Sequence, residues 1–245
     1  MKAMILAAGL GTRLRPLTDD RPKALVEIAG RTLLEITLAR LRSFGIHDVI
    51  INTHHFADMV IDYLKANNNF GINIKVSREE ALLDTGGGLK KAAHFFLNNS
   101  ADADEPLLLH NVDVISTIDF GRMVEFHLEN RALATLAVQD RQTSRYLLFD
   151  ENLQLCGRQI GSRGLELVRP SQDRHPWAFS GIHVISPRLL GMMAEDGIFS
   201  IINSYLRLAG QGEKILAFRA DQYYWRDVGT LENVQQAARD MELWS

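Results

Sequence analysis

Glycines and cations near the start of the chain have a spacing that suits a polyphosphate. Residues 6–18 read L-A-A-G-L-G-T-R-L-R-P-L-T, and a proline and Lys23 follow shortly afterwards. Glycines such as Gly9 and Gly11 let backbone N–H groups approach an anion closely. Arg13 and Lys23 supply positive charge that would neutralise it. The segment therefore predicts a binding site for a nucleoside triphosphate.

Two standard phosphate-binding motifs do not account for this segment. No G-x-x-x-x-G-K-[ST] run of the Walker A type occurs in the chain. Gly9 and Gly11 match the first half of the dinucleotide-binding G-x-G-x-x-G fingerprint, but Leu14 stands at the position of its third glycine. On the two glycines alone, a strand-to-loop turn with surface arginines remains an alternative.

A second glycine cluster opens a predicted helix. Asp84 and Thr85 precede Gly86, Gly87 and Gly88 there. Each glycine inside a helix costs about 1 kcal/mol relative to alanine, and the close approach of a ligand would compensate for that cost. An ordinary glycine-rich helix start is the alternative.

These segments need a scaffold that brings distant residues together, and the hydrophobic pattern predicts one. Apolar runs of strand length alternate with helical patterns, which is typical of βαβ units and of a mainly parallel sheet with helices on both faces. Ligands of such sheets bind at the carboxyl ends of the strands, where the first glycine segment and Asp113 would both lie. We expect strands over 3–8, 49–52, 72–77 and 106–111, and helices over 33–44, 57–67, 87–97 and 120–130.

The second half of the chain has a more strand-rich pattern. We expect strands over 132–139, 146–150, 177–186 and 214–219, and helices over 188–194 and 200–209. Gly181 interrupts an apolar strand, which indicates either a bulge or the close approach of a ligand. Residues 163–176 contain two prolines and many polar residues, so we expect a mobile loop there.

Composition excludes several classes of function. With 245 residues, 46% of them hydrophobic and 23% charged, the chain is ordinary for a globular protein with a large core. A net charge of −3 gives no support for nucleic-acid binding, and a single cysteine, Cys156, excludes a disulfide framework and a cysteine-based metal site. No apolar run approaches the roughly 20 residues of a membrane span, so we expect a cytoplasmic protein.

Five motifs, in this order, resemble those of the sugar-1-phosphate nucleotidylyltransferases. They are the L-A-A-G-x-G-T-R-L-x-P-L-T…P-K run, the loop 84–88, the apolar strand that leads to Asn111-Val112-Asp113, the F-S-G-I run 179–182 and the W-R-D-V-G-T run 225–230. The resemblance implies an α/β fold of the Rossmann-like three-layer αβα type, with a mixed, mainly parallel sheet, a strand-rich sugar-binding lobe and no C-terminal β-helix. It implies one domain, 1–245, with a nucleotide-binding half (1–131) and a sugar-binding half (132–245).

Enzymes of this family transfer a nucleotidyl group from a nucleoside triphosphate to a sugar 1-phosphate and release pyrophosphate. The sugar phosphate is already a nucleophile, so positioning, cations and a divalent metal supply most of the acceleration. The resemblance assigns catalytic roles to Arg13, Lys23 and Asp113, and it implies that Mg²⁺ binds between the carboxylates of Asp113 and Asp227. Capping of the following helix is the alternative role of Asp113, although Asp119 is better placed for it.

The same motifs imply the binding residues. The nucleotide-binding set is Leu6, Ala8, Gly9, Gly11, Thr12, Arg13, Asp84, Thr85, Gly86 and Gly87, and the sugar-binding set is Asn111, Arg145, Ser180 and Gly181. An ionised Asp84 only accepts hydrogen bonds, which suits the N–H groups of uracil or guanine and opposes cytosine. Arg145 either pairs with the sugar phosphate or lies on the surface. Val112 stands where the family has a glycine. The larger side chain would narrow the pocket, so the identity of the sugar stays open.

Short single-domain members that join UTP to N-acetylmuramate 1-phosphate have the most similar motifs, which implies a role in cell-envelope metabolism. A mannose- or heptose-1-phosphate guanylyltransferase is the enzymatic alternative. A nucleotide-sensing regulatory protein on the same fold is the non-enzymatic one. We expect no nucleic-acid or membrane partner, and either a monomer or a homodimer.

Overall fold

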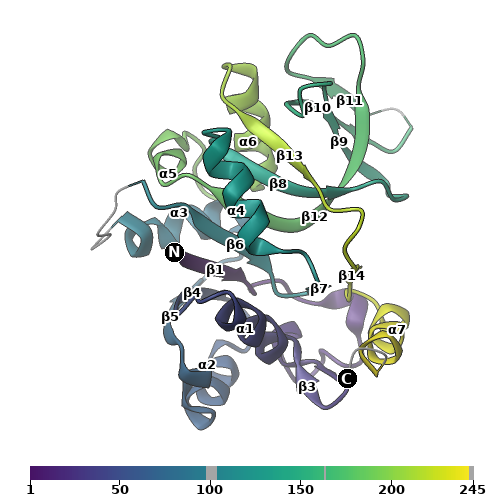
Figure 1. Cartoon of the computed structure of the whole chain (residues 1–245). Helices are drawn as coiled ribbons and strands as arrows, with labels where there is room; N and C mark the ends of the chain where they lie inside the picture. The colour runs from purple at the N-terminus through teal and green to yellow at the C-terminus, as the bar shows by residue number, and fades with distance from the viewer. Residues whose placement is uncertain (98–103, 163, 243–245) are drawn as a thin grey trace.

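The computed structural model describes residues 1–97, 104–162 and 164–242, and one mixed sheet of ten strands runs through this part of the chain. Figure 1 shows helices on both faces of the sheet. It also shows a group of strands that projects at one end, formed by β9 (Arg145–Phe149), β10 (Leu155–Ile160) and β11 (Gly164–Leu167). The three-layer αβα arrangement expected from the sequence is confirmed.

The N-terminal part of the sheet is parallel. Its strands lie in the order β6–β1–β4–β5, with bounds β1 (Lys2–Leu6), β4 (Asp48–Thr53), β5 (Asn73–Arg78) and β6 (Leu107–Asn111). β1 lies between two other strands, and its side chains from Ala3 onward are buried. The register places Leu6 opposite both Asn52 and Asn111. The segments that follow β1 and β6 therefore leave the sheet side by side.

The C-terminal part of the sheet is mainly antiparallel. β12 (His175–Ile185) pairs with β6, with β9 and with β8 (Ala134–Gln139), and so joins the two parts. β13 (Ile215–Arg219) runs parallel to β8. The register of β12 against β8 shifts between Phe179 and His183, and Gly181 has φ +73° there. A bulge at Gly181, one of the two expectations for this glycine, is confirmed.

Two apolar cores lie on the two faces of the sheet, because successive residues of a strand point to opposite sides. Ala3 and Ile5 of β1 belong to the core that includes α1, α2, α4 and α7, whereas Met4 and Leu6 belong to the core that includes α3, α5 and α6. The helices are α1 (Leu33–Ser43), α2 (Ala57–Ala66), α3 (Asp84–Leu97), α4 (Phe120–Glu129), α5 (Arg188–Met192), α6 (Ile201–Gly210) and α7 (Leu231–Glu242).

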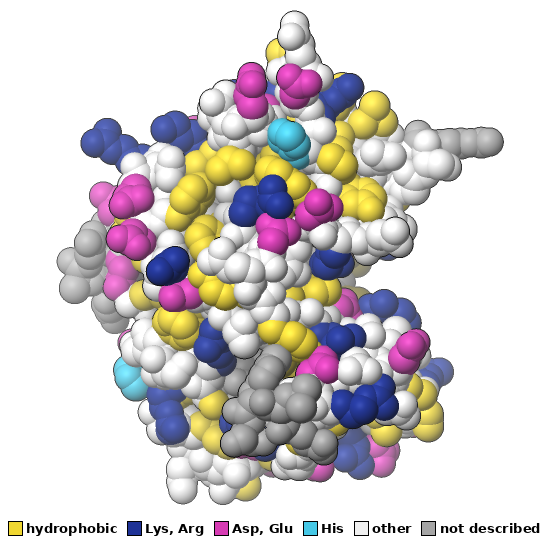
Figure 2. Space-filling view, turned by 45° about the vertical axis from the view of Figure 1, so that its right-hand side comes forward, with side chains coloured by type: hydrophobic (Ala, Val, Ile, Leu, Met, Phe, Trp, Pro, Cys, Tyr) yellow, Lys and Arg dark blue, Asp and Glu magenta, His cyan; other side chains and the backbone are white. Residues whose placement is uncertain are grey.

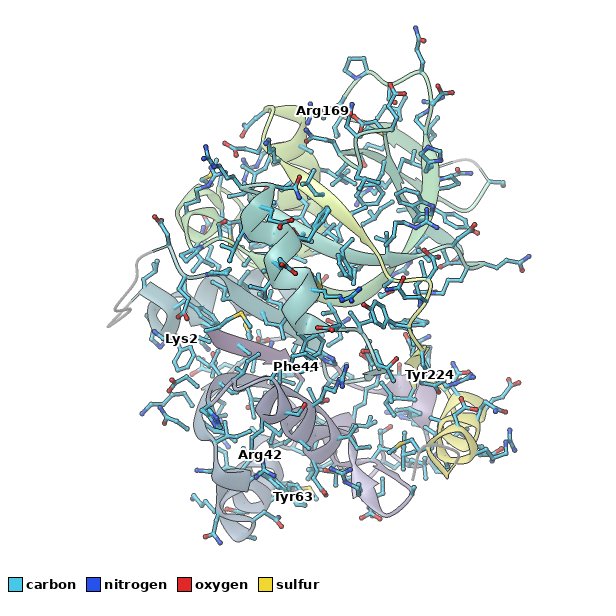
Figure 3. The ribbon with its side chains drawn as sticks, viewed as in Figure 1. Lys2, Arg42, Phe44, Tyr63, Arg169 and Tyr224 are labelled. Carbon is cyan, nitrogen blue, oxygen red and sulfur yellow. The ribbon has the colours of Figure 1, made fainter. Side chains whose placement is uncertain are left out.

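Two short two-stranded sheets complete the fold. β2 (Glu27–Ile28) pairs with β3 (Arg31–Thr32), and β14 (Trp225–Asp227) pairs antiparallel with β7 (Val114–Ser116). α7 is tied to β14 through Asp240, which accepts hydrogen bonds from Tyr224 at 2.5 Å and from Arg226 at 3.0 Å. Figure 3 labels Tyr224 beside α7. The C-terminal segment is thereby held against the loop that follows β6.

The structure differs from the expected elements in two respects. β11 occupies residues 164–167 and pairs with β10, and β12 begins at His175, so the expectation of a mobile loop is wrong for 164–167 and 175–176; residue 163 lies outside the described ranges. The hydrophobic pattern does not predict β10, α7 or the short strands β2, β3, β7 and β14. Gly157, Arg158 and Gln159 interrupt the apolar run of β10, and α7 is mostly polar.

The glycines that open α3 are packed against the protein itself. A Cβ on Gly86 would overlap the ring of Phe199, and a Cβ on Gly87 would overlap the carbonyl oxygen of Gly197. A Cβ on Gly88 would lie 2.7 Å from Nδ2 of Asn52 and 2.8 Å from Oε1 of Glu79. The segment that leads into α6 therefore approaches α3 more closely than any residue with a side chain would allow.

This packing predicts that Gly86→Ala destabilises the fold. We expect a loss of about 1–3 kcal/mol in the free energy of unfolding, because the added methyl group has to displace the Phe199 ring. Urea denaturation followed by circular dichroism measures the loss. Gly191→Ala in α5 is the matched control, since no heavy atom lies within 4 Å of its added Cβ. Equal stability of the two variants would contradict the packing argument.

Candidate active site

Two cavities lie at the carboxyl ends of the parallel strands and share a wall. The smaller cavity has a volume of about 320 Å³ and includes Ala8, Gly9 and Lys23 in its lining. The larger has a volume of about 870 Å³ and is lined by parts of β9, β12, α6 and β14. Asp84, Thr85 and Asn111 line both cavities. Figure 2 shows that the surface is hollowed between the upper and lower halves of the molecule.

The first glycine segment forms a fixed turn with one open position. Gly11 has φ +67°, and its added Cβ would lie 2.9 Å from Cγ2 of Thr18. The Gly11 carbonyl accepts hydrogen bonds from the Thr18 hydroxyl at 2.9 Å and from the Leu14 N–H at 2.8 Å. Gly9 is exposed, and nothing lies within 4 Å of its added Cβ. A ligand therefore has open access to the backbone at Gly9, while Gly11 shapes the turn.

Lys23 and Asp113 form an ion pair beside this turn. The Lys23 side chain is 10% exposed and that of Asp113 is 19% exposed. Pro22 precedes a short 3-10 helix, Lys23–Leu25, which directs the lysine toward the end of β6. A charge taken this far out of water requires a partner of opposite sign, and each of these two groups supplies the other's.

The pairing of β14 with β7 brings Asp227 close to Asp113. Asp227 lies opposite Val114 in the ladder, and the Val228 N–H donates to the Asp113 carbonyl at 2.8 Å. The two aspartates, 114 positions apart in the sequence, thus stand at the same end of the two strands. Among the described residues, no group of three or more His, Cys, Asp or Glu side chains could hold a metal ion. A cation at this position would have two carboxylates available.

Arg13 reaches the same place from the glycine segment. A Cβ added to Gly229 would lie 2.7 Å from Nη2 of Arg13 and 2.6 Å from Oδ1 of Asp227. The same Oδ1 accepts a hydrogen bond from the Gly229 N–H at 2.6 Å. Glycine at 229 thus leaves room for the guanidinium and the carboxylate to lie together. The structure thus brings two cations and two carboxylates together from four separate segments.

The start of α3 presents Asp84 and Thr85 to both cavities. Asp84 is exposed at φ +60°, and its Oδ1 accepts the Thr85 N–H at 2.6 Å. Gly86 and Gly87 are buried, and their N–H groups donate to the Phe199 carbonyl at 2.9 and 3.3 Å. The close approach inferred from these glycines is made by the protein chain, whereas the residues open to a ligand are Asp84 and Thr85.

The other residues of the predicted set lie around the cavities. Leu6, Ala8 and Val112 line the smaller cavity, and Thr12 begins the 3-10 helix that carries Arg13. Asn111, Ser180, Gly181 and Arg145 line the larger one, Arg145 as an exposed residue at the start of β9. Oδ1 of Asn111 and Oγ of Ser180 are buried without a hydrogen-bond partner.

Sequence reasoning missed Arg141. Its guanidinium lies 3.6 Å from the centroid of the Trp225 ring, and its Nη2 donates to the Phe179 carbonyl at 2.7 Å. Trp225 is itself fixed by a hydrogen bond from its indole N–H to the Ser180 carbonyl at 2.7 Å. The only available signal for Arg141 was its position just after a strand that ends at the predicted ligand edge.

Three buried histidines near the sheet are held in the neutral form. Burial lowers the pKa of His183 to about 3 and those of His110 and His127 to about 4. His183 hydrogen-bonds through Nδ1 to the hydroxyl of Tyr205 at 2.7 Å. These histidines therefore act as uncharged core groups around neutral pH.

Comparisons with known proteins agree with this architecture. The model of the nucleotidyl transferase family matches residues 2–243. An N-acetylmuramate alpha-1-phosphate uridylyltransferase of Caulobacter vibrioides is 33% identical over 235 residues, which cover 93% of this chain and 91% of that protein. A mannose-1-phosphate guanyltransferase of Yarrowia lipolytica is 29% identical; the match covers 94% of this chain and 61% of that longer protein.

A solved structure has the same fold. The crystal structure of a putative glucose-1-phosphate thymidylyltransferase from Bacillus anthracis aligns with a TM-score of 0.80 at 18% identity, covering 98% of this chain and 94% of the other. The fold is thus that of a Rossmann-like α/β transferase. The chain belongs to the nucleotidyl transferase family. In the described part of the chain, no helix is both long enough and apolar enough to cross a bilayer.

The buried histidines predict a loss of stability in mild acid. Their pKa values are lower in the folded chain than the ordinary 6.5, so the unfolded chain binds more protons as the pH falls below about 6.5. Stability present at pH 7 is therefore lost on acidification, by about 1–2 kcal/mol for each histidine at pH 5.

The test is chemical denaturation at pH 7 and pH 5. His110→Gln should reduce the pH dependence of the free energy of unfolding by the share of one histidine, because that group no longer titrates. His55→Gln is the control, since His55 is exposed. A pH dependence that is identical in the wild type and in His110→Gln would exclude this explanation.

Proposed function

We propose that the protein transfers a nucleotidyl group from a nucleoside triphosphate to a sugar 1-phosphate. The observation that carries the proposal is the gathering of Lys23, Asp113 and Asp227, which line the two cavities, with Arg13 beside Asp227 at Gly229. In this assignment the smaller cavity holds the nucleotide and the larger one holds the sugar. The reacting phosphates then lie between them, beside the charged groups.

The carboxylate pair is suited to Mg²⁺. Asp113 already has a cationic partner, the Lys23 ammonium. Asp227 lies close to Asp113, because β14 pairs with β7, the strand that follows Asp113. Magnesium commonly binds one or two protein carboxylates together with phosphate oxygens. Asp113 and Asp227 would hold the ion, which would supply positive charge to the phosphates as they react.

The side chains provide the remaining positioning. Arg13 would bind the β- and γ-phosphates that leave as pyrophosphate, with the backbone at Gly9 and Thr12 as further donors. Lys23 would stabilise negative charge on the reacting α-phosphate. The phosphate of the sugar attacks without a general base, because its oxygen is already ionised near neutral pH. The protein's task is then to align two polyanions and to offset their mutual repulsion.

Specificity is assigned to the walls of the cavities. Asp84 would accept a hydrogen bond from the base, with Thr85, Gly86 and Gly87 shaping the loop around it. Asn111, Ser180 and Gly181 would bind the sugar hydroxyl groups. Val112 lines the smaller cavity, so its bulk acts at the nucleotide end.

We propose UTP and N-acetylmuramate 1-phosphate, or a related sugar phosphate, as the substrates. The supporting observation is the 33% identity, over nearly the whole of both chains, to a protein named N-acetylmuramate alpha-1-phosphate uridylyltransferase. Mannose 1-phosphate with GTP is the second candidate, supported by the 29% identity to a mannose-1-phosphate guanyltransferase. We place the reaction in the cytoplasm and within one domain, catalysed by a monomer or a homodimer.

The proposal predicts release of pyrophosphate in the presence of Mg²⁺, a matching nucleoside triphosphate and a sugar 1-phosphate. A coupled pyrophosphate assay with each triphosphate and a panel of sugar phosphates should give the highest kcat/KM for UTP with N-acetylmuramate 1-phosphate. Chelation of the metal with EDTA should abolish the signal, and added Mg²⁺ should restore it. Nucleotide binding without turnover for every pair would favour a sensing role on this fold.

The metal assignment predicts that Asp113→Asn and Asp227→Asn each lower kcat by at least about 100-fold, because each variant removes one negative charge from the cation site. Thermal unfolding of Asp227→Asn should stay close to that of the wild type, whereas Asp113→Asn should unfold at a lower temperature, because it leaves the Lys23 ammonium without its carboxylate partner. Asp119→Asn is the control: Asp119 caps α4 by accepting the Arg122 N–H at 3.1 Å, and asparagine also caps helices well. Full turnover in either Asp113→Asn or Asp227→Asn would remove that residue from the site.

A further inference from the structure

We propose that Arg141 is the cation that binds the phosphate of the sugar 1-phosphate substrate. This assignment rests on the proposed function and identifies a residue for which no motif gave a role. Three features of Arg141 support the assignment: its fixed orientation, its lack of an ion pair and its place near Asp227.

The guanidinium of Arg141 is fixed by neighbours that do not neutralise it. It stacks on the Trp225 ring at 3.6 Å from the centroid and donates from Nη2 to the Phe179 carbonyl. Trp225 is anchored in turn to the Ser180 carbonyl, so the stacking surface is itself held in place. A planar cation fixed on an aromatic ring presents its remaining N–H groups in one direction, which suits two-point binding of an anion.

Among the described residues, Arg141 is not held in an ion pair, although the Asp227 carboxylate lies near enough to act on its charge. Two other arginines that line the larger cavity are paired: Arg158 with Glu166 at 2.7 Å and Arg226 with Asp240 at 3.0 Å. In the described part of the chain, no carboxylate forms an ion pair with Arg141, and its Nε is buried without a hydrogen-bond partner. A half-buried, unpaired cation at a cavity wall favours an anionic ligand strongly, because the protein has already removed much of its water.

The position of Arg141 selects the phosphate over an anionic group elsewhere on the sugar. Burial lowers the pKa of Arg141, while the nearby Asp227 carboxylate acts in the opposite direction. Arg141 therefore lies within electrostatic reach of the carboxylate pair, where the attacking phosphate has to stand. Arg145 is exposed and pairs in register with Ile160 at the ends of β9 and β10. Since Arg145 also lines the larger cavity, we assign it to the outer part of the sugar.

The test compares Arg141→Gln with Arg145→Gln on two sugar phosphates, N-acetylmuramate 1-phosphate and N-acetylglucosamine 1-phosphate, which differ by a lactyl ether group that carries a carboxylate. For Arg141→Gln we expect the KM of both sugar phosphates to rise by about 30- to 100-fold, with the KM of the triphosphate changed less than about threefold. The KM values of Arg141→Lys should lie between those of the wild type and of Arg141→Gln, since lysine keeps the charge and lacks the planar guanidinium. Arg145→Gln should raise the KM of N-acetylmuramate 1-phosphate more than that of N-acetylglucosamine 1-phosphate, because Arg145 is assigned to the outer part of the sugar. Arg122→Gln, at an exposed position of α4 outside both cavities, is the control and should leave both KM values unchanged.

Three results would overturn the assignment. They are an unchanged KM for both sugar phosphates in Arg141→Gln, a loss confined to the sugar that carries the carboxylate, and an equal rise in the KM of the triphosphate. If the wild type releases no pyrophosphate with any pair, the proposed function fails. Calorimetric titration of glucose 1-phosphate into the wild type and Arg141→Gln then decides the binding role by itself, with weaker binding to the variant as the supporting result and equal binding as the contrary one.

Discussion

The antiparallel pairing of β14 with β7 is the contact on which the arrangement of the site depends. It joins a three-residue strand near the C-terminus to the loop after β6, and the Val228 N–H extends the contact to the Asp113 carbonyl. Without this ladder, Asp227 and Trp225 would have no fixed relation to the parallel sheet. A strand so short contributes little stability alone, so α7 secures it through Asp240. The contacts that hold β14 in place therefore also fix the position of Asp227 relative to Asp113.

Charge balance explains why the four converging side chains tolerate their partial burial. Lys23 neutralises Asp113, and Arg13 lies beside Asp227 across Gly229. Each carboxylate thus has a nearby cation from the N-terminal segment, and the local sum of formal charges is close to zero. Gly229 is as necessary to this arrangement as the charged groups, since any side chain there would separate Arg13 from Asp227. Arg141 differs from these paired groups, because the groups in contact with its guanidinium are an aromatic ring and a carbonyl group.

Much of the fold could be predicted from the sequence, because alternating apolar runs specify buried parallel strands and their covering helices. Three local features could also be inferred, because the residue type at each position indicates the backbone conformation. They are the turn at Gly11, the helix cap at Asp119 and the bulge at Gly181. β10 and α7 could not, since tertiary packing rather than apolar periodicity determines them. The convergence of Asp113 with Asp227 depended on the family motifs, because nothing local marks β14 as the partner of β7. Glycine is required at 86 and 87 because Phe199 and Gly197 pack directly against these positions, and both residues are more than a hundred positions away in the sequence.

The ion pair between Lys23 and Asp113 has a consequence for the order in which substrates enter. Under the proposed function, a free divalent ion that arrives alone has to displace the ammonium from Asp113 and leave it without a counter-ion. A metal–triphosphate complex avoids this penalty, because its phosphate oxygens give Lys23 a new partner as the metal takes the carboxylate. The resting protein would thus favour the complex over the bare ion, and the lysine would move to the reacting phosphate only when the nucleotide has arrived.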